Sequence, residues 1–363
     1  MRHFILIGCL FYSFLAQSQD KVEIIELSFD NIKEEAKYAI TDVVDLRTNT
    51  EIIGSVMKGM GNNPRNAAFP ESLDQYLLKA YTSIMNPDTS AIELIMLINK
   101  FEISEVIFGN VEYGFFEMEF EFAVSTEGEL MSQGIYEVLH SKSGIDVTKK
   151  HDDIILGGLQ KSLKLLPYLE KYAGSRDTIS RSPIKIDNTI WKTPKAGLYN
   201  SFASVLLEQP IIESDYEFER ASGTSKHPAY YIKTDLKDEL VELMLFASDG
   251  ESLYMQGARS HTSNLFLPVL EYGPILYFED KFSDSGATMA FGVIGAAAST
   301  KGRAIILDTR SRESKRLTNY VLYHLSKGHP KIMKTYRKSK RKLEDKHKLI
   351  SDLNIAILAD GED

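Results

Sequence analysis

Residues 115–125 read FFEMEFEFAVS, and this stretch decides the fold of the first half of the chain. Large apolar residues occupy every second position with glutamates between them: Phe116, Met118, Phe120 and Phe122 alternate with Glu117, Glu119 and Glu121. A period of two is typical of a β-strand with one buried face. The pattern therefore predicts that the aromatic side chains face the core and that the carboxylates face water. Residues 126–129 (TEGE) predict a turn, and residues 130–139 the partner strand.

Two amphipathic helices are expected around this hairpin. After Pro70, apolar residues recur at three- and four-residue steps until Asn86-Pro87-Asp88, namely Leu73, Leu77, Ala80, Tyr81 and Ile84. A second stripe follows two acidic residues that suit a helix N-terminus: Asp152 and Asp153, then Ile155, Leu159, Leu163 and Leu166. Strands are expected at 22–27, 38–46 and 92–98, and a loop at 54–66. This order predicts a two-layer α/β domain over residues 19–173.

The composition changes over residues 174–190, which are rich in Gly, Ser, Arg, Asp and Pro and predict a linker. Beyond it we expect a short helix at 198–207 and strands at 215–219, 229–234, 240–247, 252–256, 265–270, 275–279 and 303–307. Two helices, 313–327 and 330–353, close the chain, separated by Gly328 and opened again by Pro330. Residues 191–358 are thus predicted to form a mostly antiparallel sheet domain with two C-terminal helices. The predicted fold class of the whole chain is α+β.

The first 18 residues predict a secretory signal peptide. Arg2 supplies the positive start, residues 4–15 an apolar run, and Ala16-Gln17-Ser18 a cleavage pattern of small residues. The run is shorter than the ~20 residues that span a bilayer, so a retained anchor is the weaker interpretation. Residues 6–9 (LIGC) resemble a lipobox, which leaves lipidation of Cys9 open as a minor alternative. Cys9 is the only cysteine, so cleavage would exclude disulfides, thiolate zinc sites and cysteine nucleophiles.

Charge is unevenly distributed along the chain. The formal net charge is -9, which argues against general affinity for nucleic acid. The last predicted helix is nevertheless basic, with Lys334, Arg337, Lys338 and Arg341 among its cations. These four are candidate contacts to lipid headgroups or an envelope protein. A solvated helix face is the favoured alternative, with Met333, Tyr336, Leu343, His347 and Ile350 facing the protein.

Several short motifs resemble functional sites but lack a required part. Gly59-Met60-Gly61 begins like a dinucleotide loop but meets Pro64 before a helix can start. Gly250-Glu251-Ser252 resembles a serine nucleophile elbow, but the flanking pattern is strand–turn–strand. His151-Asp152-Asp153 contains metal-binding residue types without a metal-like spacing, and His324 is expected to be half-buried in a helix. We therefore assign no catalytic, cofactor-binding or metal-binding residue and expect no cofactor.

Residues 285–300 (SGATMAFGVIGAAAST) are uncharged and mostly small. They are too few to span a membrane, and Lys301-Gly302 reverses the order that a phosphate-binding loop needs. We favour tight packing or a mobile loop. Insertion of Phe291 and Ile294 into lipid or a partner groove is the alternative.

The second half resembles uncharacterised secreted proteins of Gram-negative bacteria. The resemblance covers residues 191–354 and rests on GLY at 197–199, SDGESLY at 248–254, YFE at 277–279 and the closing helices; it implies no known activity. The first half resembles YajG-type envelope lipoproteins in VVDLR at 43–47, in Ile53-Gly54 and in its order of elements. That resemblance implies a binding or assembly role in the cell envelope.

The expected function follows from the leader, the incomplete motifs and these resemblances. We expect an exported protein, periplasmic or associated with the outer membrane, with a non-catalytic binding or assembly role. It would have no transmembrane span after cleavage of residues 1–18. An exported hydrolase with a dispersed active site is the main alternative, and a structural surface component acting through the basic helix is another.

Overall fold

The computed structural model describes residues 22–28, 34–58, 63–108, 111–144, 146–169, 178–179, 193–221, 228–235, 238–256, 265–282 and 301–361. It contains three β-sheets and several helices, which confirms the predicted α+β class. The predicted signal peptide and the segment 285–300, with Phe291 and Ile294, lie outside the described residues. So does the predicted linker, apart from residues 178–179.

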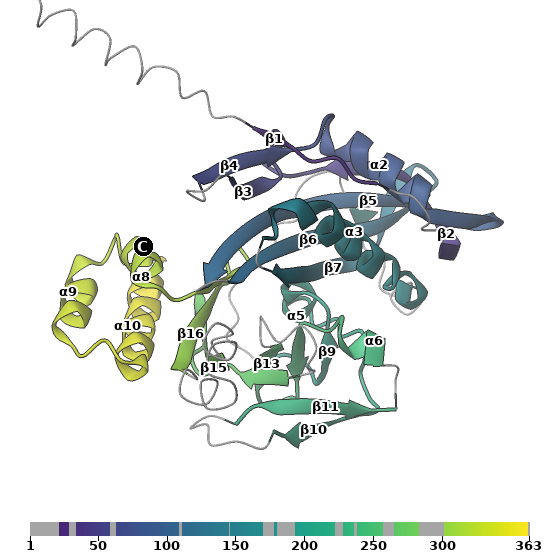
Figure 1. Ribbon diagram of the computed structural model, residues 1–363. Coiled ribbons are helices and arrows are strands. Elements are labelled where there is room, and N and C mark those ends of the chain that lie inside the picture. Colours follow the sequence, from purple (N-terminus) through teal and green to yellow (C-terminus); the bar gives the residue numbers. More distant parts are fainter. Residues whose placement is uncertain are drawn as a thin grey trace, which may run out of the picture.

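The first half is built on one eight-stranded sheet, ordered β1-β4-β3-β5-β6-β7-β8, with β2 paired to β5. Its strands are β1 (Glu23–Ile24), β2 (Glu34–Asp45), β3 (Gly54–Lys58), β4 (Asn63–Ala68), β5 (Met85–Phe108), β6 (Val111–Thr126), β7 (Glu129–Gly144) and β8 (Thr178–Ile179). Strands β5, β6 and β7 are long, and β6 is antiparallel to both of its neighbours, whereas β2 runs parallel to β5. They form the scaffold of the first half (Figure 1).

Helices α2 (Leu73–Ile84) and α3 (His151–Leu163) bury the aromatic face of β6. Phe116, Phe120 and Phe122 share one core with apolar residues of both helices. The two helices are also joined directly, because the Tyr81 hydroxyl lies 2.8 Å from Ser162 Oγ and both residues are buried. Short 3-10 turns flank α3 at Thr148–Lys150 and Leu166–Tyr168. The predicted apolar stripes of both helices and the aromatic face of β6 are thus confirmed.

The expected loop at 54–66 is wrong, because β3 and β4 form an antiparallel hairpin there. Gly54 makes this arrangement sterically feasible. It pairs with Ile103 of β5 at a φ of +132°, and a Cβ at this position would lie 2.0 Å from the Ile103 carbonyl oxygen. Only glycine tolerates both the backbone conformation and the close approach. Long-range pairing with β5, absent from the local sequence pattern, decides this segment.

The second half contains two antiparallel sheets. The six-stranded sheet comprises, in spatial order, β10 (Tyr216–Arg220), β11 (Tyr230–Thr234), β14 (Leu265–Pro268), β13 (Leu253–Gln256), β12 (Phe246–Ser248) and β9 (Gly197–Tyr199). The three-stranded sheet comprises β15 (Ile275–Phe282), β16 (Lys301–Asp308) and β17 (Glu313–Arg316). Two short helices, α5 (Phe202–Leu206) and α6 (Asp238–Val241), connect the strands. The predicted antiparallel pairing is therefore confirmed, although it is split over two sheets.

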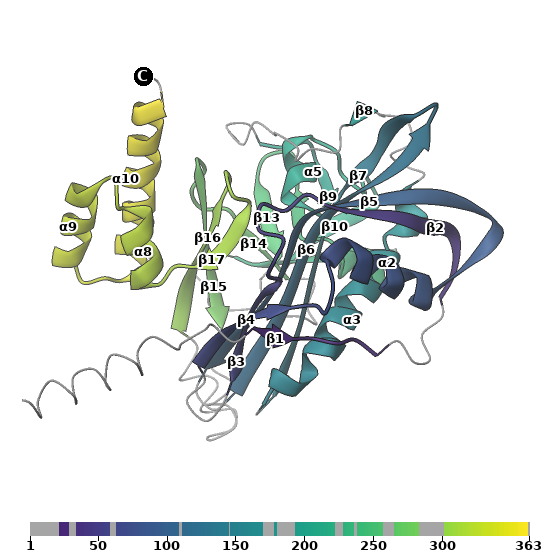
Figure 2. The same ribbon diagram turned by 90° about the horizontal axis from the view of Figure 1, so that it is seen from above.

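The C-terminal region ends in three helices, α8 (Asn319–Leu325), α9 (Pro330–Lys338) and α10 (Leu343–Gly361). Figures 1 and 2 place them at one end of the molecule, beyond β15–β17. The single helix expected at 330–353 is broken after Lys338, and Arg341 has a φ of 54°. The helix expected at 313–327 is strand β17 followed by α8, because residues 313–316 pair with β16.

Two further expectations for the second half need correction. The strand predicted at 240–247 begins as helix α6, and only 246–248 form strand β12. The helix predicted at 198–207 starts at Phe202, after strand β9, where Ser201 and Ser204 form a reciprocal capping box. The capping pair explains where the helix begins.

The two halves are in direct contact at strand β7. The Asn200 side chain accepts a hydrogen bond from Glu137 N (2.8 Å) and donates one to Leu243 O, and Ser201 Oγ donates to Ile135 O (2.9 Å). These side chains satisfy backbone groups of β7 that another strand would otherwise pair. Consequently the second half covers the face of the long strands opposite α2 and α3.

Candidate functional site

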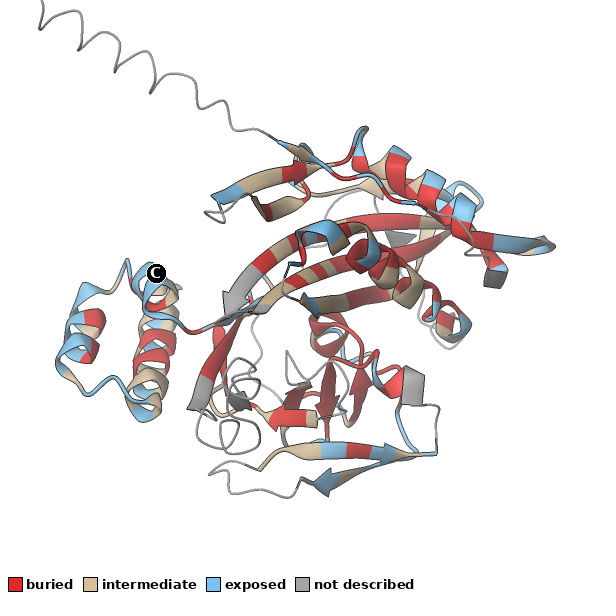
Figure 3. Cartoon of the chain, in the orientation of Figure 1, coloured by how far each residue is buried: buried red, intermediate tan, exposed pale blue. Residues whose placement is uncertain are grey.

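On the acidic face of the long strands, two of the three β6 carboxylates that were expected to face water are buried, and the third, Glu117, is partly exposed. Glu119 and Glu121 are 4% and 2% exposed. Strand register aligns Lys100 of β5 with Glu119 of β6, and Glu119 with Glu137 of β7. Because the second half covers this face, the period-two pattern correctly assigns the residues to one face but wrongly assigns that face to solvent. Figure 3 shows the runs of buried residues along these strands.

A cleft of about 370 Å³ opens over this row, between the first half and the β16–β17 turn. Its polar lining includes Asn99, Lys100, Glu102, Glu117, Glu119, Glu137 and Arg312; Arg47, Thr48, Asn49, Ile52, Gly54, Phe101 and Ser311 complete the wall. Its volume falls within the range of small-molecule sites. Residues from both halves are therefore needed to form it.

Two cations pair with the carboxylates of the cleft. Lys100 Nζ lies 2.6 Å from Glu117 Oε1 and 3.8 Å from Glu102 Oε2. Arg312 Nη2 lies 2.9 Å from Glu119 Oε1. The pair of Arg312 with Glu119 joins the halves, since Arg312 belongs to the β16–β17 turn. Together the pairs neutralise most of the charge that burial would otherwise penalise.

Burial raises the pKa of two carboxyl groups in the cleft, Glu137 and Glu119. Burial raises the pKa of Glu137 well above its usual range; the carboxylates of Glu117 and Glu119 raise it further, and Lys100 offsets only part of this effect. Burial also raises the pKa of Glu119, against the lowering effects of Arg312 and Lys100. At Lys100 burial favours the neutral amine, but the neighbouring carboxylates, Glu117 first, outweigh it and raise the pKa. The site thus places Glu137, whose raised pKa favours the protonated form, beside the ion-paired carboxylates of Glu117 and Glu119.

Two buried acceptor oxygens in the cleft receive no aligned hydrogen bond from any described residue: Asn99 Oδ1 and Glu119 Oε1. Arg312 is close to Glu119 Oε1 but does not point an N–H at it in hydrogen-bonding geometry. Asn99 lies at a register shift between Ile98 and Lys100, where β5 has one extra residue relative to β6. A β-bulge of this kind redirects a side chain, and here the bulged residue lines the cleft.

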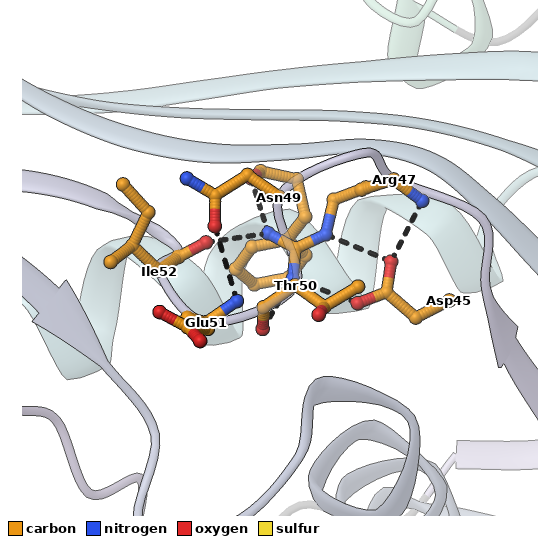
Figure 4. Close-up of polar contacts among 7 residues, drawn as sticks. Asp45, Arg47, Asn49, Thr50, Glu51 and Ile52 are labelled. Atoms are coloured by element: carbon orange, nitrogen blue, oxygen red, sulfur yellow. Dashed lines mark hydrogen bonds and ion pairs between the residues drawn. The ribbon is translucent and has the colours of Figure 1, made fainter.

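The neighbouring loop is braced by a buried arginine (Figure 4). Arg47 makes a two-point ion pair with Asp45, through Nε–Oδ1 at 2.9 Å and Nη2–Oδ2 at 2.8 Å, and both side chains are less than 10% exposed. Arg47 Nη1 also donates to the carbonyls of Ile52 (2.8 Å) and Phe101 (3.3 Å). All three nitrogens of the guanidinium thus already donate hydrogen bonds within the protein. Arg47 therefore fixes the wall of the cleft and is not available to a ligand.

The basic residues predicted as contacts are exposed, as a contact surface requires. Lys334, Arg337 and Lys338 lie on α9, and Arg341 follows it with its guanidinium 3.4 Å from the Arg337 carbonyl oxygen. The structure thus brings these four together. Of the residues predicted to face the protein, Met333, Tyr336 and Ile350 are buried.

The histidine-containing motifs do not form a metal site among the described residues. His151 is buried against Glu105 of β5, whose Oε2 accepts a hydrogen bond from Met57 N, while Asp153 pairs with Lys142. Across the described residues, no three His, Cys, Asp or Glu side chains are placed to hold a metal ion. His324 is exposed, which corrects its expected half-burial. On α8 it is Leu322 that is buried, with Val321 and Leu325 packed against the same core, and this orientation leaves His324 outside.

Neither motif with glycine is followed by a helix. Residues 248–252 connect β12 to β13 as a turn, with Asp249 Oδ1 accepting hydrogen bonds from Glu251 N and Ser252 N. This confirms the hairpin and not a nucleophile elbow. Residues 59–62 lie outside the described residues, and the element that follows them is strand β4, which begins at Asn63 and pairs with β3.

Comparison with known protein families gives a match in the second half of the chain. Residues 199–355 match a family of unknown function (DUF6563), which supports the prediction of an uncharacterised C-terminal region. No curated protein and no solved structure matches the chain significantly. The matched region contains Asn200, Ser201 and Arg312, the side chains that dock on the first half. The YajG-type resemblance of the first half stays a prediction. None of the described helices is long and apolar enough to cross a membrane.

Proposed function

We propose that the protein is a non-catalytic binding protein that holds a small polar molecule in the cleft between its halves. The observation that carries this proposal is the pair of buried acceptor oxygens in the cleft, Asn99 Oδ1 and Glu119 Oε1, that receive no aligned hydrogen bond. Arg312 balances the charge of Glu119 but does not satisfy this acceptor, and a buried acceptor without a donor is costly. A bound molecule with amino or hydroxyl groups would supply the donors.

The charge of the cleft narrows the ligand further. Asp45 neutralises Arg47, and Lys100 and Arg312 are each paired with a glutamate. Because Lys100 lies within ion-pair distance of both Glu117 and Glu102, the carboxylates lining the cleft outnumber the cations that face them. Anionic ligands are therefore disfavoured, and molecules bearing an amine together with hydroxyl groups are favoured.

Calorimetric titration with glucosamine as a probe tests this proposal, with glucose and glucose 6-phosphate as analogues. We expect glucosamine to bind more tightly than glucose and the phosphate ester not to bind. Glu119→Gln should weaken glucosamine binding by about tenfold, because a hydrogen bond to a charged acceptor is worth ~1.5–3 kcal/mol. Glu93→Gln, at an exposed site of β5, is the control. Equal binding of the phosphate ester, or no binding of either amine or hydroxyl probe, would contradict the proposal.

One observation supports hydrolysis as a second candidate. Glu137 leans toward its protonated form in the same cleft as Glu117, which is ion-paired with Lys100. Hydrolases of the acid–base type use one protonated and one ionised carboxyl. Under the binding proposal, 4-nitrophenyl glycosides are not turned over. Turnover that is abolished in Glu137→Gln but retained in Glu93→Gln would favour the hydrolase instead.

The proposed location is the periplasm or the inner side of the outer membrane. Support comes from the predicted signal peptide at residues 1–18 and from the resemblance of both halves to exported proteins. Cell fractionation with mass spectrometry of the N-terminus provides the test. We expect a mature chain that lacks residues 1–18, and recovery of an intact N-terminus in the cytoplasm would refute this location.

A further inference from the structure

The C-terminal helices carry a continuous basic surface. Between residues 327 and 342 the chain has eight lysines and arginines and no acidic residue. All eight are exposed: Lys327, Lys331, Lys334, Arg337, Lys338, Lys340, Arg341 and Lys342. We call this set the basic face. Among the described residues no ion pair involves any of the eight, so no carboxylate neutralises their charge.

The periodicity of α9 explains this arrangement. Met333 and Tyr336 are buried, whereas Lys331, Lys334 and Lys338 recur at three- and four-residue steps on the opposite side of the helix. The helix is therefore anchored by its apolar residues and presents its cations away from the protein.

Exposed aromatic residues extend the basic face onto α8. Tyr320 is 73% exposed and Tyr323 is 50% exposed. The guanidinium carbon of Arg337 lies 6.0 Å from the centre of the Tyr323 ring, and His324 contacts both tyrosine rings. Aromatic and cationic side chains thus form one surface. Tyrosine has an apolar ring and a polar tip, and such residues are enriched where apolar and aqueous phases meet.

Charge is segregated between this end and the rest of the chain. Residues 319–361 contain ten lysines and arginines and four acidic residues, which gives this segment a net charge of +6. Because the whole chain has a net charge of -9, the rest of the chain has a net charge of -15. Near an anionic surface the helices would be attracted and the remainder repelled. Because the helices lie at one end of the molecule (Figures 1 and 2), the opposed charges give the chain a defined orientation.

We propose that the basic face, with Tyr320 and Tyr323, docks on the anionic headgroups of a membrane surface. The cations supply long-range attraction, about fivefold in affinity for each charge near an anionic leaflet. The two tyrosines enter the headgroup layer and supply the short-range contact. Binding is peripheral and reversible, and it leaves the cleft between the halves accessible.

Vesicle co-sedimentation of the chain without residues 1–18 tests this docking, since the apolar run of those residues would itself bind lipid. We expect binding to vesicles that contain phosphatidylglycerol and none to pure phosphatidylcholine. Binding should disappear at about 1 M salt, where the screening length is about 3 Å. The double variant Lys334→Glu with Lys338→Glu should bind at least roughly tenfold more weakly.

A matched variant separates local charge from net charge. Lys149→Glu with Lys233→Glu changes the net charge by the same amount at exposed sites on other elements, and we expect it to retain binding. Tyr320→Ser with Tyr323→Ser should weaken binding while preserving its dependence on salt. Equal loss in the matched variant, or no binding to phosphatidylglycerol vesicles, would overturn the proposal. Salt-sensitive self-association without vesicle binding would also overturn it and assign the basic face to a second copy of the chain.

Discussion

The two faces of the β5–β6–β7 strands are both buried, yet one is aromatic and the other acidic. On the first, Phe116, Phe120 and Phe122 pack against α2 and α3. On the second, Glu119 and Glu121 are 4% and 2% exposed, and Arg312 of the other half of the chain pairs with Glu119. The aromatic face is stabilised by removal of apolar area from water. The acidic face is tolerated because its charges are paired or protonated.

The difference shows how a fold can reserve polar groups for a site. An acidic row could be replaced by apolar residues of similar size without loss of stability, because buried ion pairs contribute little net stability. The presence of Lys100, Glu117, Glu119 and Glu137 beneath a cleft is therefore not accounted for by stability, and the proposed binding role would account for it. The following predictions test this division of roles, from the largest expected effect to the smallest.

Truncation on the aromatic face should have the largest effect on stability. Phe120 is fully buried and contacts the rings of Phe122 and Tyr136. Phe120→Ala should lower the free energy of unfolding by about 3–5 kcal/mol, as large-to-small changes in cores do. Urea unfolding followed by circular dichroism measures this change. Tyr231→Ala, at a residue that is 44% exposed, is the control, and an equal loss there would contradict the assignment of the core.

The sequence alone predicts the aromatic face, both of its helices and the hairpin at 248–252, because these depend on local periodicity and turn chemistry. It fails where pairing partners are distant. The β3–β4 hairpin depends on β5, and β17 depends on β16, whereas the local residues suit a loop or a helix. Local propensity is a weak guide when a strand is fixed by long-range contacts.

The cleft was missed for a related reason. Periodicity places glutamates on one face of β6 but cannot show what covers that face. One signal was present: Glu137 interrupts the apolar run IYEVL at 135–139, and Lys100 follows the apolar run at 92–98. A nearly continuous apolar strand is typically covered on both faces, so a charge within it is expected to be buried and paired. Arg312, which lines the cleft and pairs with Glu119, follows that residue by nearly 200 positions, and nothing in the sequence near either residue predicts their contact.

The second-largest effect should come from Glu121 on the acidic face, whose titration makes the stability of the fold depend on pH. Burial raises the pKa of Glu121 from 4.5 to about 7, against the lowering effect of a hydrogen bond from Ser132. Between these two values the unfolded chain is ionised while the folded chain keeps its proton. This group therefore makes stability fall as the pH rises from about 4.5 to 7, by at most about 3 kcal/mol.

Glu121→Gln should flatten this decline, since an amide resembles the protonated carboxyl. We expect the variant and the unaltered protein to be equally stable near pH 4.5 and the variant to be more stable above pH 7. Urea unfolding at several pH values measures the two profiles. Glu93→Gln should retain the original profile; if Glu121→Gln retained it too, the carboxyl of Glu121 would not be held in its neutral form.

Removal of the arginine that joins the halves should have the smallest effect. Arg312→Ala leaves Glu119 buried without its cation, which we expect to cost about 2 kcal/mol at pH 7. The cost is limited because burial already raises the pKa of Glu119, and removal of Arg312 raises it further, so the carboxyl can take up a proton. The cost should accordingly be smaller at pH 5, where protonation of Glu119 is easier.

Arg310→Ala is the matched control for this change. Arg310 lies in the same turn and pairs with Asp308, but its side chain is 58% exposed, so its removal should cost less than about 1 kcal/mol at either pH. A pH-dependent loss confined to Arg312→Ala would show that the two halves meet through a buried, titratable contact. Equal and pH-independent losses in both variants would instead mean that the acidic face is hydrated, as the sequence pattern by itself suggests.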